Sequence, residues 1–516
     1  MKPASFLSGS LVFATSAAAL SLGAPVDVRD AVSRIKAEGL TRSQVMDIAA
    51  TLTDVHGARL TGSPGARAAG EYARAKLQEW GMANARLEPW PFGPGWSNER
   101  FWIRLVTPQP FPLLAYPRAW TPSTNGAVKG EAILITGQTP LDLEKFRGKL
   151  RGKFVVVEAD PERPADESLP PRYGNADLAA LAEPPLVAAV RPLRMSNERR
   201  EFNLKRDELF VNEGALGAIE PSRFVRNGTV LVARSGARTP SDPALVPTIV
   251  MAIEHYGRIV RLLQLSVPVE IEMDAQNRVH TGTVDSFNVV AEIAGTDKKD
   301  DIVLLGAHLD SWHSGTGATD NAAGCAVMME ALRILKSTGL TLRRTVRVAL
   351  WTGEEHGLLG SRAYVKDHIG DRTTMTLKPG HGAHTVYFNM DAGAGAIRGI
   401  YLQGNSAARP VFAEWLAPLA GLGATAVSTR DSTPGGSDHQ SFDEIGVPGF
   451  QFIQDPGDYE DRTHTHHTNM DVYESLVGAD LQKNAVIVAV LAYQAANREE
   501  GVPRKALPAP ARGAGR

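Results

Sequence analysis

The chain has 516 residues, of which 43% are hydrophobic and 22% charged, and its formal net charge is -2. This length exceeds what one ordinary hydrophobic core covers, so we expect two or three folded units. A nearly neutral chain without a strong electrostatic preference argues against nucleic acid as a partner. The single cysteine, Cys325, lies in a dense apolar helical pattern and is predicted to be a core residue.

The N-terminus has the pattern of a cleaved secretory signal, which we assign to residues 1–24. Lys2 precedes the apolar, small-residue stretch "FLSGSLVFATSAAALSLGA", after which "PVDVRD" is polar. A short buried helix is the alternative interpretation. No later segment reaches the roughly 18 to 20 uninterrupted apolar residues that a membrane-spanning helix needs. We therefore expect a secreted or periplasmic protein with no transmembrane segment in the mature chain.

The next 250 residues suggest helices followed by a β-rich unit. Residues 30 to about 90 have helical patterns, and the Pro-rich "LEPWPFGPGW" is expected to interrupt regular structure. From 127 to 280 the chain has short strand-like runs, "EAILITG", "GKFVVVEA", "GTVLVA", "PTIVMA" and "PVEIEM". Between them, the polar, Pro-rich residues 160–186 are predicted to be an exposed loop.

After residue 285 strands and helices alternate. Apolar strand-length runs are followed by helical patterns four times, beginning with "DIVLLGAH" and "NAAGCAVMMEALRILKSTG". Near-continuous apolar strands between helices are typical of a sheet covered on both faces. The predicted fold class is therefore α/β, with a mixed, largely parallel sheet and helices on both faces. Residues 501–516 are predicted to be a disordered tail.

Charged residues follow several of these strands. His308 and Asp310 come at the end of the first, Glu354 and Glu355 after the second, and Asp391 after the third. In open α/β sheets, ligands bind outside the carboxyl ends of the strands. The sequence therefore predicts that these side chains form one cluster.

Two further segments supply ligands of the same kind. Asp320 lies in "GATDNAAG", and "RTHTHHTNMD" contains His464, His466 and His467. Clustered carboxylates without a counter-charge cost several kcal/mol per buried ion, a cost that a divalent cation removes. Two zinc ions that share one bridging carboxylate need about five residues. The sequence supplies them and leaves Glu354 over, beside Glu355, as a general base.

Six ordered motifs resemble the co-catalytic zinc aminopeptidases of metallopeptidase family 28. They are "GAHLDSW", "GATDNAAG", "LWTGEEHGLLGS", "NMDAGA", "GGSDHQSFDEIGVPGF" and "HHTNMD". "AHLDSW" after a β-rich insertion is similar to the branch that includes carboxypeptidase Q, where the insertion is a protease-associated domain. The resemblance covers roughly residues 40 to 497.

The resemblance implies a role for each candidate residue. It implies two zinc ions, with ligands and supporting residues as follows: His308 and Asp391 on one ion, Glu355 and His467 on the other, Asp320 bridging, Glu354 as the base and Asp310 orienting His308. His467 is preferred because "HTNMD" matches the family's His-Thr/Ser-x-x-Asp pattern, while His464 and His466 remain open alternatives. A cis-type peptide at Asp320–Asn321 is also implied.

The resemblance further implies a discontinuous catalytic domain, residues 30–126 and 281–500, interrupted by a protease-associated domain at 127–280. The implied activity is that of an exopeptidase, an aminopeptidase or dipeptidase, acting on peptides with a free terminus. A glutaminyl-cyclase-like acyltransferase and a non-catalytic, receptor-like binding protein are the alternatives. Asp438 and His439 are interpreted as part of a pocket loop rather than a further metal site. The oligomeric state stays open, with a homodimer as one option.

Overall fold

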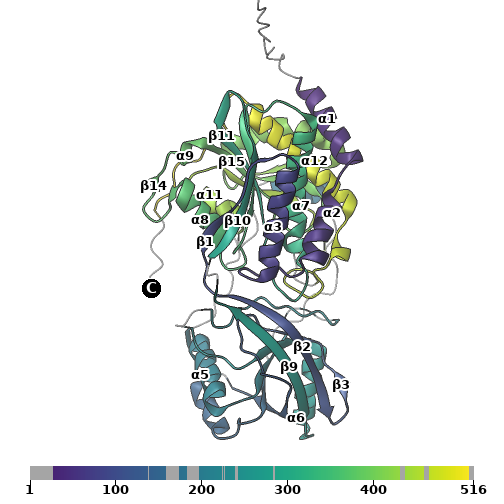
Figure 1. Cartoon of the computed structure of the whole chain (residues 1–516), viewed down its shortest axis with the longest axis vertical. Coiled ribbons are helices and arrows are strands. Elements are labelled where there is room, and N and C mark those ends of the chain that lie inside the picture. The colour runs from purple at the N-terminus through teal and green to yellow at the C-terminus, as the bar shows by residue number, and fades with distance from the viewer. Residues whose placement is uncertain are drawn as a thin grey trace, which may run out of the picture.

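A computed structural model describes residues 27–510, apart from 138, 159–173, 183–196, 224, 226, 239–241, 283–284, 431–435, 458 and 460–463. The predicted signal, residues 1–24, and the end of the predicted tail, 511–516, lie outside the described residues. Within the described part, the chain forms two eight-stranded sheets, in two units that lie one above the other in Figure 1.

The first sheet is mixed, with a parallel centre. In spatial order its strands are β1 (Ala83–Pro91), β10 (Asp285–Ile293), β12 (Arg344–Trp351), β11 (Lys298–His308), β15 (His384–Asn389), β18 (Gly449–Gln454), β16 (Ile397–Tyr401) and β17 (Ala426–Ser428). The central strands β12, β11, β15 and β18 run parallel to their neighbours in that group, whereas β1 and β10 are antiparallel. The predicted mixed α/β fold is therefore confirmed.

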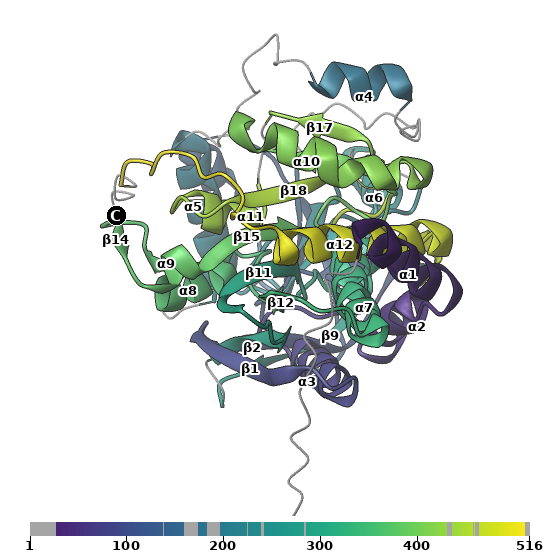
Figure 2. The same cartoon turned by 90° about the horizontal axis from the view of Figure 1, so that it is seen from above.

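Helices cover both faces of this sheet, as Figure 2 shows. On one side lie α1 (Val28–Thr41), α2 (Val45–Ala50), α3 (Pro64–Glu79), α7 (Ala323–Thr338), α10 (Arg409–Leu416) and α12 (Gly478–Asn497), and on the other α8 (Leu359–His368), α9 (Gly380–Ala383) and α11 (His439–Asp443). Alternate strand residues enter the two layers: Val303 and Leu305 belong to the core with α7 and α12, and Leu304 to the core with α8 and α11.

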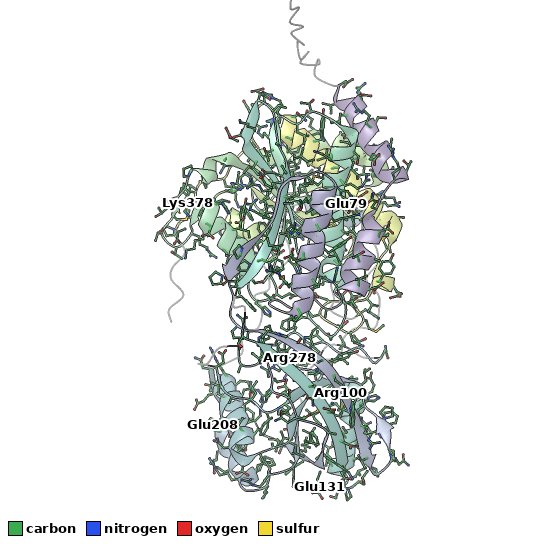
Figure 3. The ribbon with its side chains drawn as sticks, viewed as in Figure 1. Glu79, Arg100, Glu131, Glu208, Arg278 and Lys378 are labelled. Carbon is green, nitrogen blue, oxygen red and sulfur yellow. The ribbon has the colours of Figure 1, made fainter. Side chains whose placement is uncertain are left out.

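The second sheet has, in spatial order, β3 (Phe111–Pro112), β2 (Gly95–Thr107), β9 (Glu270–His280), β5 (Val128–Ile135), β6 (Phe154–Val157), β7 (Gly217–Pro221), β8 (Thr248–Met251) and β4 (Ala115–Pro117). The long strands β2 and β9 are joined by ion pairs, Arg100 to Asp274 at 2.7 Å and Arg278 to Glu99 at 3.2 Å. Figure 3 labels both arginines. The helices α5 (Asn197–Glu213) and α6 (Ile253–Gln264) pack in this unit and were not predicted.

The remaining elements are short. They are the hairpin strands β13 (Gly370–Asp371) and β14 (Thr376–Leu377), the helix α4 (Asn175–Ala182), and the helical turns Thr51–Val55, Pro140–Phe146, Ala318–Ala322, Ser406–Ala408, Ala417–Leu422 and Tyr473–Ser475. The helix α4 falls within the predicted loop 160–186, so that prediction is wrong there. No helix in the described part combines the length and apolar character that a membrane crossing requires.

Three further predictions of local structure differ from the fold. The Pro-rich stretch 87–96 contains the end of β1 and the start of β2, because long-range pairing with β10 and β9 supplies the partners that the local sequence lacks. The run "GTVLVA" forms only a single bridge, Leu231 to Thr468. The predicted disordered tail is wrong at Arg504, which donates to His384 O at 2.6 Å, and at Lys505, which pairs with Asp443 at 2.7 Å.

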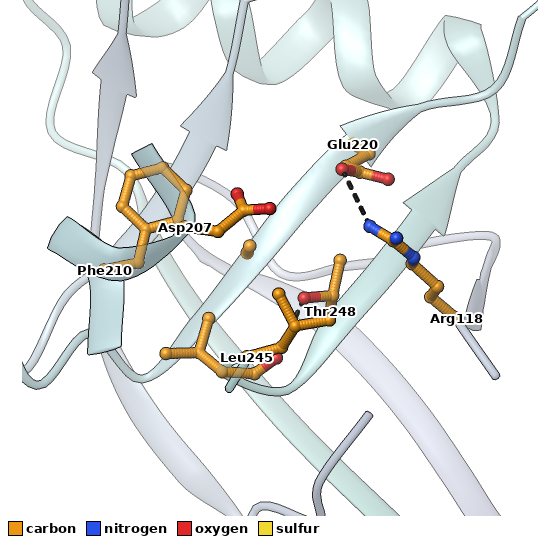
Figure 4. Close-up of a pocket in the computed structure, with 8 residues that line it drawn as sticks. Arg118, Asp207, Phe210, Glu220, Leu245 and Thr248 are labelled. Atoms are coloured by element: carbon orange, nitrogen blue, oxygen red, sulfur yellow. Dashed lines mark hydrogen bonds and ion pairs between the residues drawn. The ribbon is translucent and has the colours of Figure 1, made fainter. Parts of the chain in front are cut away.

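A pocket in the second unit is lined by Arg118, Glu220 and Asp207 among other residues (Figure 4). Arg118 lies 3.6 Å from Glu220, and Arg206 lies 2.5 Å from Asp207 and 3.7 Å from Glu220. Burial raises the pKa of Asp207, and Arg206 opposes that shift. The guanidinium groups thus offset the charges of the carboxylates, so the pocket belongs to the packing of this unit.

Candidate metal centre

The parallel pairing of three strands brings the charged strand ends together. In the register of β11, His308 lies opposite Trp351 of β12, and Gly306 lies opposite Asn389 of β15. The chain leaves β12 toward Glu354 and Glu355 and leaves β15 toward Asp391. The side chains after these strands therefore meet at one edge of the sheet, where α/β proteins bind ligands.

Asp320 lies between two histidines. Its Oδ1 atom is 3.0 Å from His308 Nε2, and its Oδ2 atom is 3.1 Å from His467 Nε2. Asp391 Oδ1 is 3.2 Å from His308 Nε2, and Glu355 Oε2 is 3.0 Å from His467 Nε2. The structure therefore brings together all five predicted ligands, as two half-sites that share Asp320.

The chemistry of these residues fits a pair of cations. His308 is 1% exposed and Asp320 3% exposed. Glu355 Oε1 is buried and has no hydrogen-bond partner among the described residues, and the buried Asp320 Oδ2 lies 3.1 Å from His467 Nε2 without hydrogen-bond geometry. Buried carboxylate oxygens normally have a partner, and leaving them unpaired is costly. Two histidines and three carboxylates are the donor set that zinc binds in proteins.

The acidic surroundings shift the pKa values of both histidines. Burial alone would lower the pKa of His308, but Asp391, Asp310 and Asp320 raise it well above its usual value. Burial alone would also lower the pKa of His467, but Glu355 and Asp320 raise it to about 10. The cluster therefore attracts positive charge, which a cation supplies in place of protons.

The two adjacent glutamates differ in their contacts. Burial raises the pKa of Glu355 to about 7, although His467 opposes the shift. Glu355 accepts a hydrogen bond from Trp312 Nε1 at 2.9 Å. Burial, together with Asp391 and Asp438, raises the pKa of Glu354 well above its usual value. Among the described residues, the Glu354 carboxylate forms no ion pair with either histidine.

Asp310 contacts His308 through its main chain. Its backbone carbonyl accepts a hydrogen bond from His308 Nδ1 at 2.9 Å, whereas its carboxylate is 3.7 Å from that nitrogen. The carboxylate instead accepts from Thr61 Oγ1 at 2.5 Å and from Glu354 N at 3.3 Å. Asp310 therefore orients the imidazole through the main chain and links Glu354 to the same loop.

Two residues that hold the Asp320 loop were not identified from the sequence. Asp471 accepts hydrogen bonds from Thr319 N at 2.6 Å, from Thr319 Oγ1 at 2.8 Å and from Asp320 N at 3.2 Å. In the sequence, Asp471 is marked only as the final residue of the "HTNMD" pattern. The fully buried Arg59 donates to the carbonyls of Leu309, Thr316 and Gly317 at 2.7 to 2.8 Å, and no local pattern marks it. The cis peptide implied at Asp320–Asn321 is present.

The two alternatives to His467 make different contacts. His466 Nε2 is 3.9 Å from Asp320 Oδ2, and its ring stacks on Tyr459. In His464 the backbone carbonyl accepts a hydrogen bond from Thr468 Oγ1. The geometry favours His467. Asp438 and His439 are buried near the start of α11 and belong to neither of the groups of candidate ligands found among the described residues.

Comparisons with known proteins agree with this geometry. Residues 288–492 match the model of Peptidase family M28. Carboxypeptidase Q of Homo sapiens is 25% identical over 482 residues, 93% of this chain and 90% of that protein. Leucine aminopeptidase 2 of Trichophyton equinum is 36% identical over 150 residues, 29% of this chain and 28% of that protein.

Solved structures give the same result for the fold. The Peptidase M28 precursor from Shewanella amazonensis SB2B has a TM-score of 0.67 and 26% identity, covering 93% of this chain and 99% of that chain. A zinc aminopeptidase from Bacillus subtilis, at 18% identity and a TM-score of 0.56, shares the fold over 88% of this chain and 95% of that chain. The chain is therefore a metallopeptidase, and its residues 288–492 match peptidase family M28.

Proposed function

We propose that the protein is an exported exopeptidase that holds two zinc ions around Asp320. His308 and Asp391 would hold one ion, Glu355 and His467 the other. The observation that carries the proposal is that Asp320 faces a different histidine with each carboxylate oxygen, at 3.0 and 3.1 Å. The zinc aminopeptidase of Bacillus subtilis supports the choice of metal.

Glu354 is the proposed general base. When bound, zinc ions of this kind polarise the scissile carbonyl and lower the pKa of a water molecule. Glu354 stands beside a ligand without pairing with either histidine, so its carboxylate is available to accept the proton of the attacking water. It then returns that proton to the departing amine. Its raised pKa suits a group that both takes up and releases a proton.

The substrates in this proposal are peptides with a free terminus, cleaved by an aminopeptidase or dipeptidase activity. Similarity to carboxypeptidase Q extends over 93% of the chain, whereas similarity to leucine aminopeptidase 2 covers 29%. The sequence contains every residue that the catalytic interpretation needs, which favours an enzyme over a receptor-like protein. Matches to peptidases favour hydrolysis over acyl transfer.

We further propose that the second unit is the protease-associated insertion and that the remainder is a discontinuous catalytic domain. The second sheet begins with β2 at Gly95 and ends with β9 at His280. Its N-terminal boundary is therefore better drawn near residue 95 than at the predicted residue 127. Export rests on the N-terminal sequence pattern alone.

The test is a peptidase assay with amino-acyl reporters, free dipeptides and N-blocked peptides, with chelator and with added zinc. We expect cleavage of unblocked substrates, loss with chelator and recovery with zinc. Glu354→Gln should abolish cleavage while zinc stays bound, and Glu131→Gln, which alters an exposed glutamate of β5, should not change the rate. Equal cleavage of blocked and unblocked peptides would contradict the exopeptidase assignment.

A further inference from the structure

A segment of the second unit pairs directly with the loop that carries His467. We name this segment, residues 228–232, the clasp. Val232 N donates to His467 O at 3.0 Å, and Leu231 forms an antiparallel bridge with Thr468. Val230 N donates to Asn469 Oδ1 at 2.6 Å, and Asn469 N donates to Val230 O at 3.2 Å. The two segments thus form a small backbone ladder between the units.

The clasp is fixed to its own unit. Val230 and Val232 are 0% and 1% exposed and pack with Val250 and Ala252, at the end of β8. Leu231 N donates to Ser222 Oγ at 2.9 Å, just after β7. Because the clasp is held by the core of the second unit, its amide groups present fixed donors to the His467 loop.

His467 needs such support because of its backbone conformation. Its φ is 61°, in the left-handed region that non-glycine residues rarely adopt. This conformation is unfavourable for a residue with a side chain and persists only where surrounding contacts hold it. The hydrogen bond from Val232 N to the carbonyl of His467 is a contact of that kind. Without the ladder, the loop would relax toward other conformations and move the imidazole.

We propose that the clasp positions the His467 imidazole, so that the second unit is a structural component of the metal centre and Asn469 is a positioning residue. The inference rests on the proposed role of His467 as a zinc ligand. It adds that the half-site of Glu355 and His467 depends on the clasp. A clasp that only joined the two units would affect unfolding but not metal binding.

The experiment measures zinc per chain of the full-length protein during titration with a chelator, by plasma mass spectrometry. In Asn469→Ala we expect one of two ions to be lost at about 10- to 100-fold lower chelator concentration than in the wild type, as is usual when a supporting partner of a ligand is removed. Asn469→Asp keeps the oxygen that accepts from Val230 and loses only the weaker donation from Nδ2 to Gly228 O at 3.3 Å, so it should restore most of the wild-type retention.

Asn277→Ala is the matched control, because Asn277 also bonds to backbone carbonyls within the second unit, Thr121 O and Pro122 O, both at 3.1 Å. It should retain both ions. Wild-type protein that binds no zinc would overturn the proposed function. Wild-type protein with two ions and an Asn469→Ala variant with equal retention would overturn only the role of the clasp.

A second measurement needs no variant. Because coupling between sites is reciprocal, zinc binding at His467 should stabilise the clasp. Zinc loading of the wild type should therefore slow hydrogen exchange at the amides of Val230 and Val232. Unchanged exchange at these amides, with two ions bound, would overturn the inference even if Asn469→Ala failed to fold.

Discussion

Asp471 is a buried carboxylate that holds the backbone around Asp320, the proposed bridging ligand. It accepts three hydrogen bonds from Thr319 and Asp320, the residues that begin the turn between β11 and α7. Burial raises its pKa to about 7, with Asp320 adding to the shift. The position of Asp320 therefore depends on a residue about 150 positions later, which local sequence patterns cannot reveal.

Asp471→Asn should weaken zinc binding about 10- to 100-fold, because an amide has one acceptor oxygen in place of two and its NH₂ group would face the Asp320 amide. Chelator titration followed by elemental analysis measures the effect. Asp301→Asn, at a partly exposed ion pair with Arg344, is the control and should retain zinc as the wild type does. Full retention in Asp471→Asn would contradict the supporting role.

His384 links stability to pH. It is 2% exposed, its Nδ1 donates to Gly380 O at 2.7 Å, and its Nε2 is 3.0 Å from Tyr364 Oη. Burial lowers its pKa to about 4. The unfolded chain therefore takes up this proton at a higher pH than the native chain does. The contribution of His384 to stability is present above pH about 6.5 and is lost as the pH falls toward about 4.

His384→Gln should show a smaller loss of stability on acidification than the wild type. The free energy of unfolding of the wild type should fall by about 2 kcal/mol more than that of the variant between pH 7.5 and pH 5. Urea denaturation at both pH values measures this, with chelator present so that metal release does not contribute. Parallel pH profiles for the two proteins would contradict a neutral, buried His384.

At the scale of elements, the loop between β11 and α7 is held by hydrogen bonds from the Arg59 side chain. Its guanidinium donates to three carbonyls of this loop and to Leu52 O at 2.9 Å. Loops of this kind cannot satisfy their own backbone carbonyls, so a buried donor is required. Arg59 fixes the loop that connects His308 to Asp320.

Arg59→Lys should lower the free energy of unfolding by about 3 kcal/mol or more, because an ammonium group has too few, differently placed donors and leaves buried carbonyls unpaired. Urea denaturation followed by far-UV circular dichroism measures the change. Arg67→Lys, on the exposed face of α3, should change stability by less than about 0.5 kcal/mol. A similarly small effect at position 59 would contradict the account of this loop.

The elements that the sequence predicts are those whose signal is local. Sequence periodicity and composition are enough to recognise the apolar runs of β11, β12 and β15 and the polar residues after them. The convergence of His308, Glu355 and Asp391 was therefore predictable. The strand β2 and the clasp were not. The Pro-rich start of β2 becomes a strand because β9 pairs with it some 170 residues later, and "GTVLVA" pairs with the His467 loop instead of a sheet.

At the scale of the whole molecule, the two units meet beside the candidate metal centre. Trp120 of the second unit belongs to the same buried cluster as Leu60 and Trp312 of the first. Trp312 Nε1 donates to Glu355, and His313 Nε2 donates to Pro117 O at 2.7 Å. Together with the clasp, these contacts join the second unit to the loop after β11 and to the His467 loop. The second unit therefore contacts loops that carry candidate ligands and supplies none of the five itself.

The most direct test of the central claim is the zinc content of the folded, full-length protein compared with that of Asp320→Asn, since Asp320 is the one residue shared by both half-sites. The account predicts about two zinc ions per wild-type chain and loss of at least one in the variant, together with its peptidase activity. Wild-type protein that is active and folded without zinc, or a variant that retains both ions, would contradict it.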